Sequence, residues 1–240
     1  MTLERNATPV RPARRRFAAS VGMALALDLA ERLGVLLLFL LFVNRMLPRL
    51  INLVLVEREH PEVILLAAGV NAQALLLVIA ESLGVALILL RRRSASLSSH
   101  PFDWALSFSA VSAPLLLTTP AAASTFIPEA LVTTLMLAGL LVQISGKLAL
   151  GRSFGLVPAN RGVKTRGLYR VVRHPIYAGY TLTHIGFLLG FPSLQNAALY
   201  AAVFAIEVVR LLREEAVLNR DPAYVAYAAR VRYRLLPGVF

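Results

Sequence analysis

Residues 63–90 read VILLAAGVNAQALLLVIAESLGVALILL, an apolar run whose only charged member is Glu81. A helix of this length rises about 42 Å, which exceeds the roughly 30 Å hydrocarbon core of a bilayer. Arg91, Arg92 and Arg93 follow directly and end the run. The pattern therefore predicts a transmembrane helix and, with it, an integral membrane protein.

Four further apolar stretches extend this pattern along the 240-residue chain. An apolar stretch that is broken near Pro192 suits two helices joined by a turn. The sequence therefore predicts an all-α, polytopic membrane protein with about six membrane helices, the last two forming a C-terminal helical hairpin. We expect four N-terminal spans in residues 1–150 and a separate C-terminal region in residues 151–240. The four further stretches are Phe17–Val43, Trp104–Thr119, Pro128–Leu150 and Ile176–Leu211.

The basic residues predict how the chain is oriented in the membrane. We call the residues before Phe17 the leader. Of the 25 Lys and Arg residues, 21 lie in the leader, directly after Leu90, between Lys147 and Arg173, or between Arg210 and Arg234. These segments share one side if the amino terminus is cytoplasmic, as basic loops prefer. We therefore expect a multi-pass protein with both termini and the C-terminal tail in the cytoplasm. The formal charge of +12 then reflects topology, and we expect no nucleic-acid partner.

The leader and the composition limit the remaining possibilities. A cleavable export signal is an alternative interpretation of the leader arginines, but the apolar stretch that follows is too long for one. A retained first helix is simpler. The absence of cysteine excludes disulfides, thiolate nucleophiles and iron–sulfur clusters, and four scattered histidines predict no metal centre.

Charged residues inside the predicted spans are costly unless they are paired. Asp28 and Arg32 are four residues apart and lie on one helix face. We expect Arg32 to form an ion pair with Asp28 or Glu81. We interpret these residues as a polar cluster that joins the first two spans, far from the C-terminal motifs, with a catalytic cluster as the alternative.

The segment GLYRVVRHPIYAGY, residues 167–180, holds the first such motif. Pro175 suits the first position of a helix, so Arg173 and His174 flank the positive end of that helix, an arrangement that binds anions. Tyr177 is expected near the same mouth, and Gly179 permits close approach of a ring or another backbone. We expect Gly186 and Gly190 to pack against the returning helix. Snorkelling of Arg173 and His174 at the membrane interface is the alternative.

The second motif lies on the returning helix and after it. Glu214 and Glu215 oppose the basic loop and predict a polar cavity, whereas a solvated charge run is the alternative. Glu207 lies two turns deeper, where a carboxylate should face protein or water. A turn at Asp221-Pro222 leads to Tyr227 and to the tail YRLLP, residues 233–237.

Together these motifs resemble the isoprenylcysteine carboxyl methyltransferase family, one of the integral membrane methyltransferases, which include phospholipid N-methyltransferases. The resemblance covers roughly residues 150–240 and implies that residues 151–240 form a methyltransferase-like catalytic region using S-adenosylmethionine. For methyl transfer we expect Arg173 or another basic loop residue to orient an acceptor carboxylate, and Glu207 or Glu214 to serve as the base for an amine acceptor. Arg173 and Glu207 are the catalytic residues that we expect. The implied cofactor-binding residues are Tyr169, His174, Pro175, Tyr177, Gly179, Glu214, Glu215 and Tyr227.

The resemblance also implies the partners. The expected acceptor is lipid-tailed, first the carboxylate of an isoprenylcysteine-like molecule, with a phospholipid or another lipophilic molecule as the alternative; membrane lipids are the other partner. Membrane sterol reductases, which use NADPH, share an arginine–histidine–tyrosine segment and a similar tail. A non-catalytic membrane scaffold is the third possibility.

Overall fold

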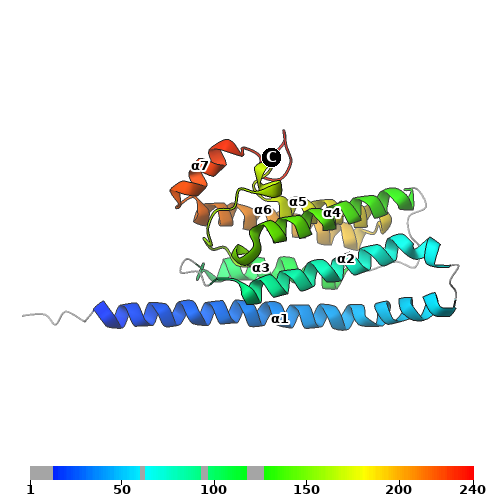
Figure 1. Ribbon diagram of the computed structural model, residues 1–240, viewed down its shortest axis with the longest axis horizontal. Coiled ribbons are helices and arrows are strands. Elements are labelled where there is room, and N and C mark those ends of the chain that lie inside the picture. The colour runs from blue at the N-terminus through cyan, green and yellow to red at the C-terminus, as the bar shows by residue number, and fades with distance from the viewer. Residues whose placement is uncertain (1–12, 60–62, 93–96, 118–126) are drawn as a thin grey trace, which may run out of the picture.

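The fold is mainly helical in the residues that the computed structural model describes, which are 13–59, 63–92, 97–117 and 127–240. These residues contain no strand, which confirms the all-α prediction. In Figure 1 the long helices lie side by side, with α7 and the tail across one end. The helices are α1 (Ala13–Glu59), α2 (Val63–Leu90), α3 (Pro101–Ser112), α4 (Glu129–Leu150), α5 (Pro175–Gly190), α6 (Leu194–Leu218) and α7 (Pro222–Arg230).

Two helical segments in the described part of the chain are long and apolar enough to cross a membrane, Glu129–Ser153 and Leu194–Leu218. Leu75–Leu90 is a shorter apolar helix. The six-span topology and the cytoplasmic tail stay predictions. Arg11 and Arg93, which belong to the predicted basic segments, lie outside the described residues.

Helix α1 is longer than predicted. The predicted first span ends at Val43, but the helix continues to Glu59 with Pro48 inside it. The residues after Pro48 return to an apolar sequence, INLVLV, so one lost backbone hydrogen bond at the proline does not end the helix. By contrast, Pro114 coincides with a change from α3 to a 3₁₀ turn, Ala113–Leu116.

Helices α4 and α5 pack so closely that their backbones touch. A Cβ atom added at Gly139 of α4 would lie 2.7 Å from the carbonyl oxygen of Gly179 of α5, and one added at Gly179 would lie 2.7 Å from the carbonyl oxygen of Gly139. Gly186 and Gly190 also face α4, against Met136 and Val132. The prediction that these two glycines pack on the returning helix is therefore wrong, because α4 takes the small face of α5.

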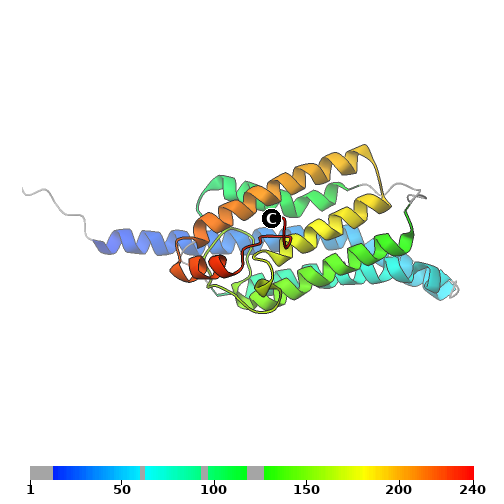
Figure 2. The same cartoon turned by 90° about the horizontal axis from the view of Figure 1, so that it is seen from above.

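The returning helix, α6, follows α5 after a short break at residues 191–193 and runs back beside it (Figure 2). Ser193 caps the start of α6, because its Oγ accepts a hydrogen bond from the Asn196 N–H at 3.1 Å. Aromatic rings fill the space between the two helices: the rings of His184 and Tyr200 stack with their centroids 4.4 Å apart. The start of α5 therefore faces the end of α6, where the predicted motifs lie.

Candidate functional site

A cavity of about 110 Å³ lies where the loop after α4, the start of α5, the end of α6 and α7 meet. We call this end of the molecule the cavity end. The predicted site residues that line it are Tyr169, Arg173, His174, Tyr177, Glu214 and Tyr227. The loop contributes residues Ser153 to Lys164 without a gap except Asn160. Pro175, Gly179, Glu207 and Glu215 lie outside the lining.

The start of α5 is held by the C-terminal tail. Pro175 occupies the first turn, as predicted, and His174 precedes it in a non-helical conformation. The Arg173 N–H donates to the Tyr233 carbonyl at 2.9 Å, and the His174 N–H donates to the Arg234 carbonyl at 2.9 Å. The tail therefore runs alongside the chain that enters α5 and sets the direction of its first side chains.

Glu215 of α6 contacts the start of α5, α7 and the C-terminal tail. Its carboxylate, almost fully buried, lies 2.8 Å from Arg173 Nη1 and 3.2 Å from His174 Nε2, and it accepts hydrogen bonds from Arg234 Nε at 2.9 Å and from Tyr224 at 3.2 Å. Four partners leave this carboxylate little capacity for a further ligand. Its cofactor-binding role stays a prediction, and its contacts are those of a clamp on the tail.

Glu214 differs from its neighbour. It lines the cavity and accepts one hydrogen bond, from the Tyr177 hydroxyl at 3.3 Å. The same Tyr177 ring lies under the guanidinium of Arg210, 5.5 Å from the ring centroid. Glu214 is therefore the acidic side chain that the cavity exposes to a ligand.

Glu207 lies two turns deeper on α6 and is 6% exposed. Within the described part of the chain its carboxylate receives no hydrogen bond, and the attraction of Arg210 is its main electrostatic contact. It also interacts electrostatically with the hydroxyls of Tyr177 and Tyr180. A buried carboxylate without a hydrogen-bond donor is costly, so the position is poised to accept a proton or a cation.

The cavity is otherwise rich in positive charge. Arg161, Lys164, Arg173 and Arg210 line it, against the single carboxylate of Glu214. The Nε atoms of Arg161, Arg173 and Arg210 are buried without a hydrogen-bond partner. Burial lowers the pKa of Arg161 to about 10, so this guanidinium is still charged at neutral pH. The three arginines therefore keep donor capacity for an anionic group.

Two tyrosines of α7 complete the wall. Burial raises the pKa of Tyr227 to about 12 and raises that of Tyr224 as well. Both hydroxyls therefore stay protonated at neutral pH and act as donors. Tyr227 donates to the Tyr169 carbonyl at 2.8 Å, which fixes the short helix Gly167–Arg170 against α7. The predicted Tyr169 and Tyr227 are thus neighbours in the structure.

The loop that forms one wall of the cavity was not predicted from the sequence. Arg161 lies in it, and no motif marked this arginine beyond its place in a basic segment. Gly179, by contrast, contacts α4; the sequence allowed the approach of another backbone, and α4 supplies it. The cofactor role of Gly179 stays a prediction.

Comparison with known families finds a similarity that covers most of the residues lining the cavity. Residues 129–221 match the model of the phospholipid methyltransferase family. The match confirms the predicted resemblance to integral membrane methyltransferases, and it runs from the first residue of α4 to Asp221, which precedes α7. No curated protein matches the sequence. Helices α1 to α3 and the tail lie outside the matched region.

Proposed function

We propose that this protein is an integral membrane methyltransferase that uses S-adenosylmethionine to methylate a lipid-tailed acceptor at the cytoplasmic face. The match of residues 129–221 and the two membrane-length helices within that range support a membrane methyltransferase. The start of α1, the end of α2, the end of α4 and α7 lie toward the same end of the molecule (Figure 1). This arrangement supports placing the basic segments on one side of the membrane.

The observation that carries the proposal is the charge pattern of the cavity. S-adenosylmethionine has a carboxylate, an ammonium and a sulfonium group, so its site needs donors at one place and an acceptor at another. Arg173 and its neighbouring arginines have buried, unpartnered Nε atoms, whereas Glu214 offers a carboxylate within the same lining. These residues fit the cofactor: the arginines would hold its carboxylate, and Glu214 would face its cationic part.

The chain's own part in catalysis is then mainly positioning. The bound cofactor supplies an electrophilic methyl group, and transfer requires the acceptor lone pair in line with it. Holding two reactants in this geometry lowers a barrier by about 7–11 kcal/mol in favourable cases. The tail clamp at Glu215 and the backbone contact between α4 and α5 provide the rigidity that such placement needs.

For the acceptor, the match to the phospholipid methyltransferase family supports an amine beside the carboxylate that we expected first. An amine must lose a proton before it attacks, and Glu207 is a buried carboxylate without a hydrogen-bond donor in the described residues. It would serve as the base. A phospholipid with an amino headgroup agrees with the family match, and its phosphate suits the arginines.

The isoprenylcysteine-like carboxylate is the second candidate. The observation in its favour is the excess of arginine over carboxylate in the cavity lining. Arg173 or Arg210 would orient the acceptor carboxylate, which needs no general base. The two candidates therefore differ in whether Glu207 is required.

Methyl transfer to defined lipids tests the proposal. Purified full-length protein in nanodiscs is given methyl-labelled cofactor with phosphatidylethanolamine or with a prenylcysteine, and the products are identified by mass spectrometry. An amine acceptor predicts labelled phospholipid and a Glu207→Gln variant at least tenfold slower, as is usual for loss of a general base. Labelled prenylcysteine with unchanged Glu207→Gln activity selects the carboxylate. Absence of labelling from every lipid, together with no cofactor binding, contradicts the proposed function.

A further inference from the structure

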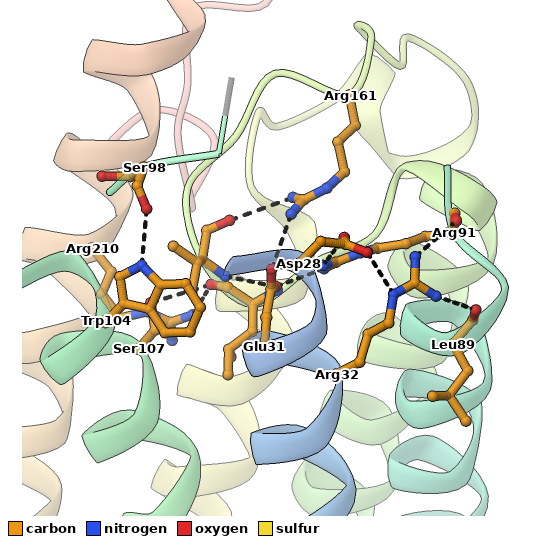
Figure 3. Close-up of polar contacts among 12 residues, drawn as sticks. Asp28, Glu31, Arg32, Leu89, Arg91, Ser98, Trp104, Ser107, Arg161 and Arg210 are labelled. Atoms are coloured by element: carbon orange, nitrogen blue, oxygen red, sulfur yellow. Dashed lines mark hydrogen bonds and ion pairs between the residues drawn. The ribbon is translucent and has the colours of Figure 1, made fainter. Parts of the chain in front are cut away.

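Five charged side chains cluster at the cavity end, where α1, the end of α2 and the loop after α4 meet (Figure 3). Asp28 accepts from Arg32 Nε at 2.8 Å and from Arg91 Nη2 at 2.7 Å, which confirms the predicted pair of Asp28 and Arg32. Arg91 also lies 2.6 Å from Glu31. Glu81 pairs instead with Lys147 of α4, at 3.2 Å.

The prediction that this cluster lies far from the C-terminal motifs is wrong. Glu31 Oε1 accepts hydrogen bonds from the backbone N–H groups of Leu156 at 2.7 Å and Val157 at 3.1 Å. Its other oxygen, Oε2, lies 3.3 Å from Arg161 Nη2. The helix α1 therefore reaches the loop that forms a wall of the cavity, across 125 residues of sequence.

The carboxylate of Glu31 is shielded from solvent. Its side chain is 0% exposed, so its charge must be satisfied by protein groups, and both oxygens are engaged. Removing one partner of a buried ion pair is strongly destabilising, because it leaves an uncompensated charge. Loss of the Glu31 carboxylate would therefore leave the two loop N–H groups and Arg161 without this partner.

The same loop peptide is held from its other side. The Leu156 carbonyl accepts from Ser107 of α3 at 3.2 Å and from Arg210 Nη2 of α6 at 3.1 Å (Figure 3). Leu156, Val157, Arg161 and Arg210 all line the cavity. Moving Glu31 would therefore displace a wall segment and alter two of its arginines together.

We propose that Glu31 is a positioning residue of the cofactor site, which fixes the wall peptide 156–157 and the guanidinium of Arg161 from a helix outside the family-matched region. The inference rests on the proposed function, because it assigns the cavity to the cofactor. It gives α1 a part in ligand binding beyond membrane anchoring. Supporting contacts of this kind keep binding groups within a fraction of an ångström of their working geometry.

Asp28 provides a matched control on the same helix. It is 4% exposed and, like Glu31, is an acidic partner of Arg91. Unlike Glu31, it makes no hydrogen bond or ion pair with the loop in the described part of the chain, and its only link to the loop there is electrostatic attraction to Arg161. Its second partner is Arg32, which donates to the carbonyls of Leu89 and Arg91. Loss of Asp28 therefore weakens the cluster and leaves the hydrogen bonds to residues 156 and 157 in place.

The experiment compares Glu31→Gln with Asp28→Asn in purified full-length protein. Binding of S-adenosylhomocysteine is measured by isothermal titration calorimetry, thermal unfolding by differential scanning fluorimetry, and amide exchange over residues 154–163 by mass spectrometry. Both variants should unfold at lower temperature than the parent. Only Glu31→Gln should weaken binding, by about tenfold, since small displacements of binding groups have large effects, and only it should speed exchange of the loop.

The outcomes separate this inference from the proposed function. A parent protein that does not bind S-adenosylhomocysteine contradicts the proposed function itself. If the parent binds, either of two results overturns the positioning role alone. In the first, Glu31→Gln binds as tightly as the parent; in the second, Asp28→Asn binds as weakly as Glu31→Gln. If Glu31→Gln cannot be purified, Glu31→Asp is compared with Asp28→Glu by the same measurements, and equal affinity of these two variants overturns it too.

Discussion

The two halves of the molecule hold their helices together by different means. Helices α4 and α5 approach until glycine carbonyls limit the distance, at Gly139 and Gly179. Helices α1 and α2 are joined at the cavity end by ion pairs centred on Arg91. Shape-limited packing leaves one relative position for two helices, whereas ion pairs give a polar joint that also reaches the loop. The region that contains the family match is therefore fixed by close backbone packing at this contact, whereas α1 supports the cavity through charge.

The largest expected effect comes from breaking the charge clamp that Glu215 forms on the C-terminal tail. Glu215→Gln removes the carboxylate charge between Arg173 and Arg234, and loss of one member of a buried ionic contact costs about 3–5 kcal/mol. Unfolding temperature should fall sharply, and limited proteolysis should cut the tail. Glu214→Gln, one residue away, should stay within about 0.5 kcal/mol of the parent. Equal stability of the two variants contradicts the clamp.

The packing of α4 on α5 is tested by a single methyl group. Gly139→Ala places a Cβ atom 2.7 Å from the Gly179 carbonyl oxygen, so the helices must separate, at a cost of about 1–3 kcal/mol. Gly22→Ala in α1 is the control, because its Cβ would meet nothing within 4 Å; alanine there should add up to about 1 kcal/mol. Thermal unfolding in detergent measures both, and similar behaviour of the two variants would remove the distinction between the halves.

Glu214 and Glu215 are also expected to differ in ligand binding, because only Glu214 lines the cavity. Glu214→Gln should weaken binding of S-adenosylhomocysteine by about 1–3 kcal/mol, the worth of a charge-assisted hydrogen bond. Glu129→Gln, at an exposed position that starts α4, controls for the change in net charge. Calorimetric titration measures the affinity of both variants. If both bind with the affinity of the parent, Glu214 does not contribute to the binding site.

The smallest effect concerns the ion pair between Asp103 of α3 and Arg213 of α6, at 2.7 Å. Burial by itself raises the pKa of Asp103, but hydrogen bonds from Arg213 and Ser98 outweigh it and hold that pKa below its ordinary value. The pair therefore adds stability above the unfolded pKa, near 3.8, and loses it as the pH falls through the lowered folded pKa.

Because Arg213 is 41% exposed, the contribution should be about 0.2–1 kcal/mol. Asp103→Asn should then unfold slightly below the parent at pH 7, and the two curves should converge in acid. A stability gap that widens as the pH falls would show that the pair does not act as described.

Local features of the fold followed well from the sequence. The bounds of α2 are those of the apolar run 63–90, because charge or proline flanks it on both sides. The length of α1 did not follow, because the sequence after Pro48 is apolar and helix-compatible. The glycines of α5 were recognised as a packing face, but a sequence pattern does not say which neighbour takes that face, and α4 does.

The site was predictable only where its residues are close in sequence or share a helix. Residues close in sequence to Pro175 or on α6 were found, since one helix start and one helix end bring them together. Arg161 and Glu31 were not found, because their roles arise from a contact between residues 125 or more positions apart. Glu215 was found, but its four protein partners depend on where the tail lies.

Direct ligand binding tests the central claim. NADPH is the ligand of the rival sterol-reductase interpretation, and electrostatic repulsion by paired glutamates is a weaker argument against it than the sequence suggested, because Arg173 and Arg234 neutralise Glu215. Titration of the purified full-length protein with S-adenosylhomocysteine and, separately, with NADPH therefore decides the matter. The account predicts saturable binding of S-adenosylhomocysteine that Glu214→Gln weakens, and no comparable binding of NADPH. Tighter binding of NADPH, or no binding of the adenosyl ligand, would contradict it.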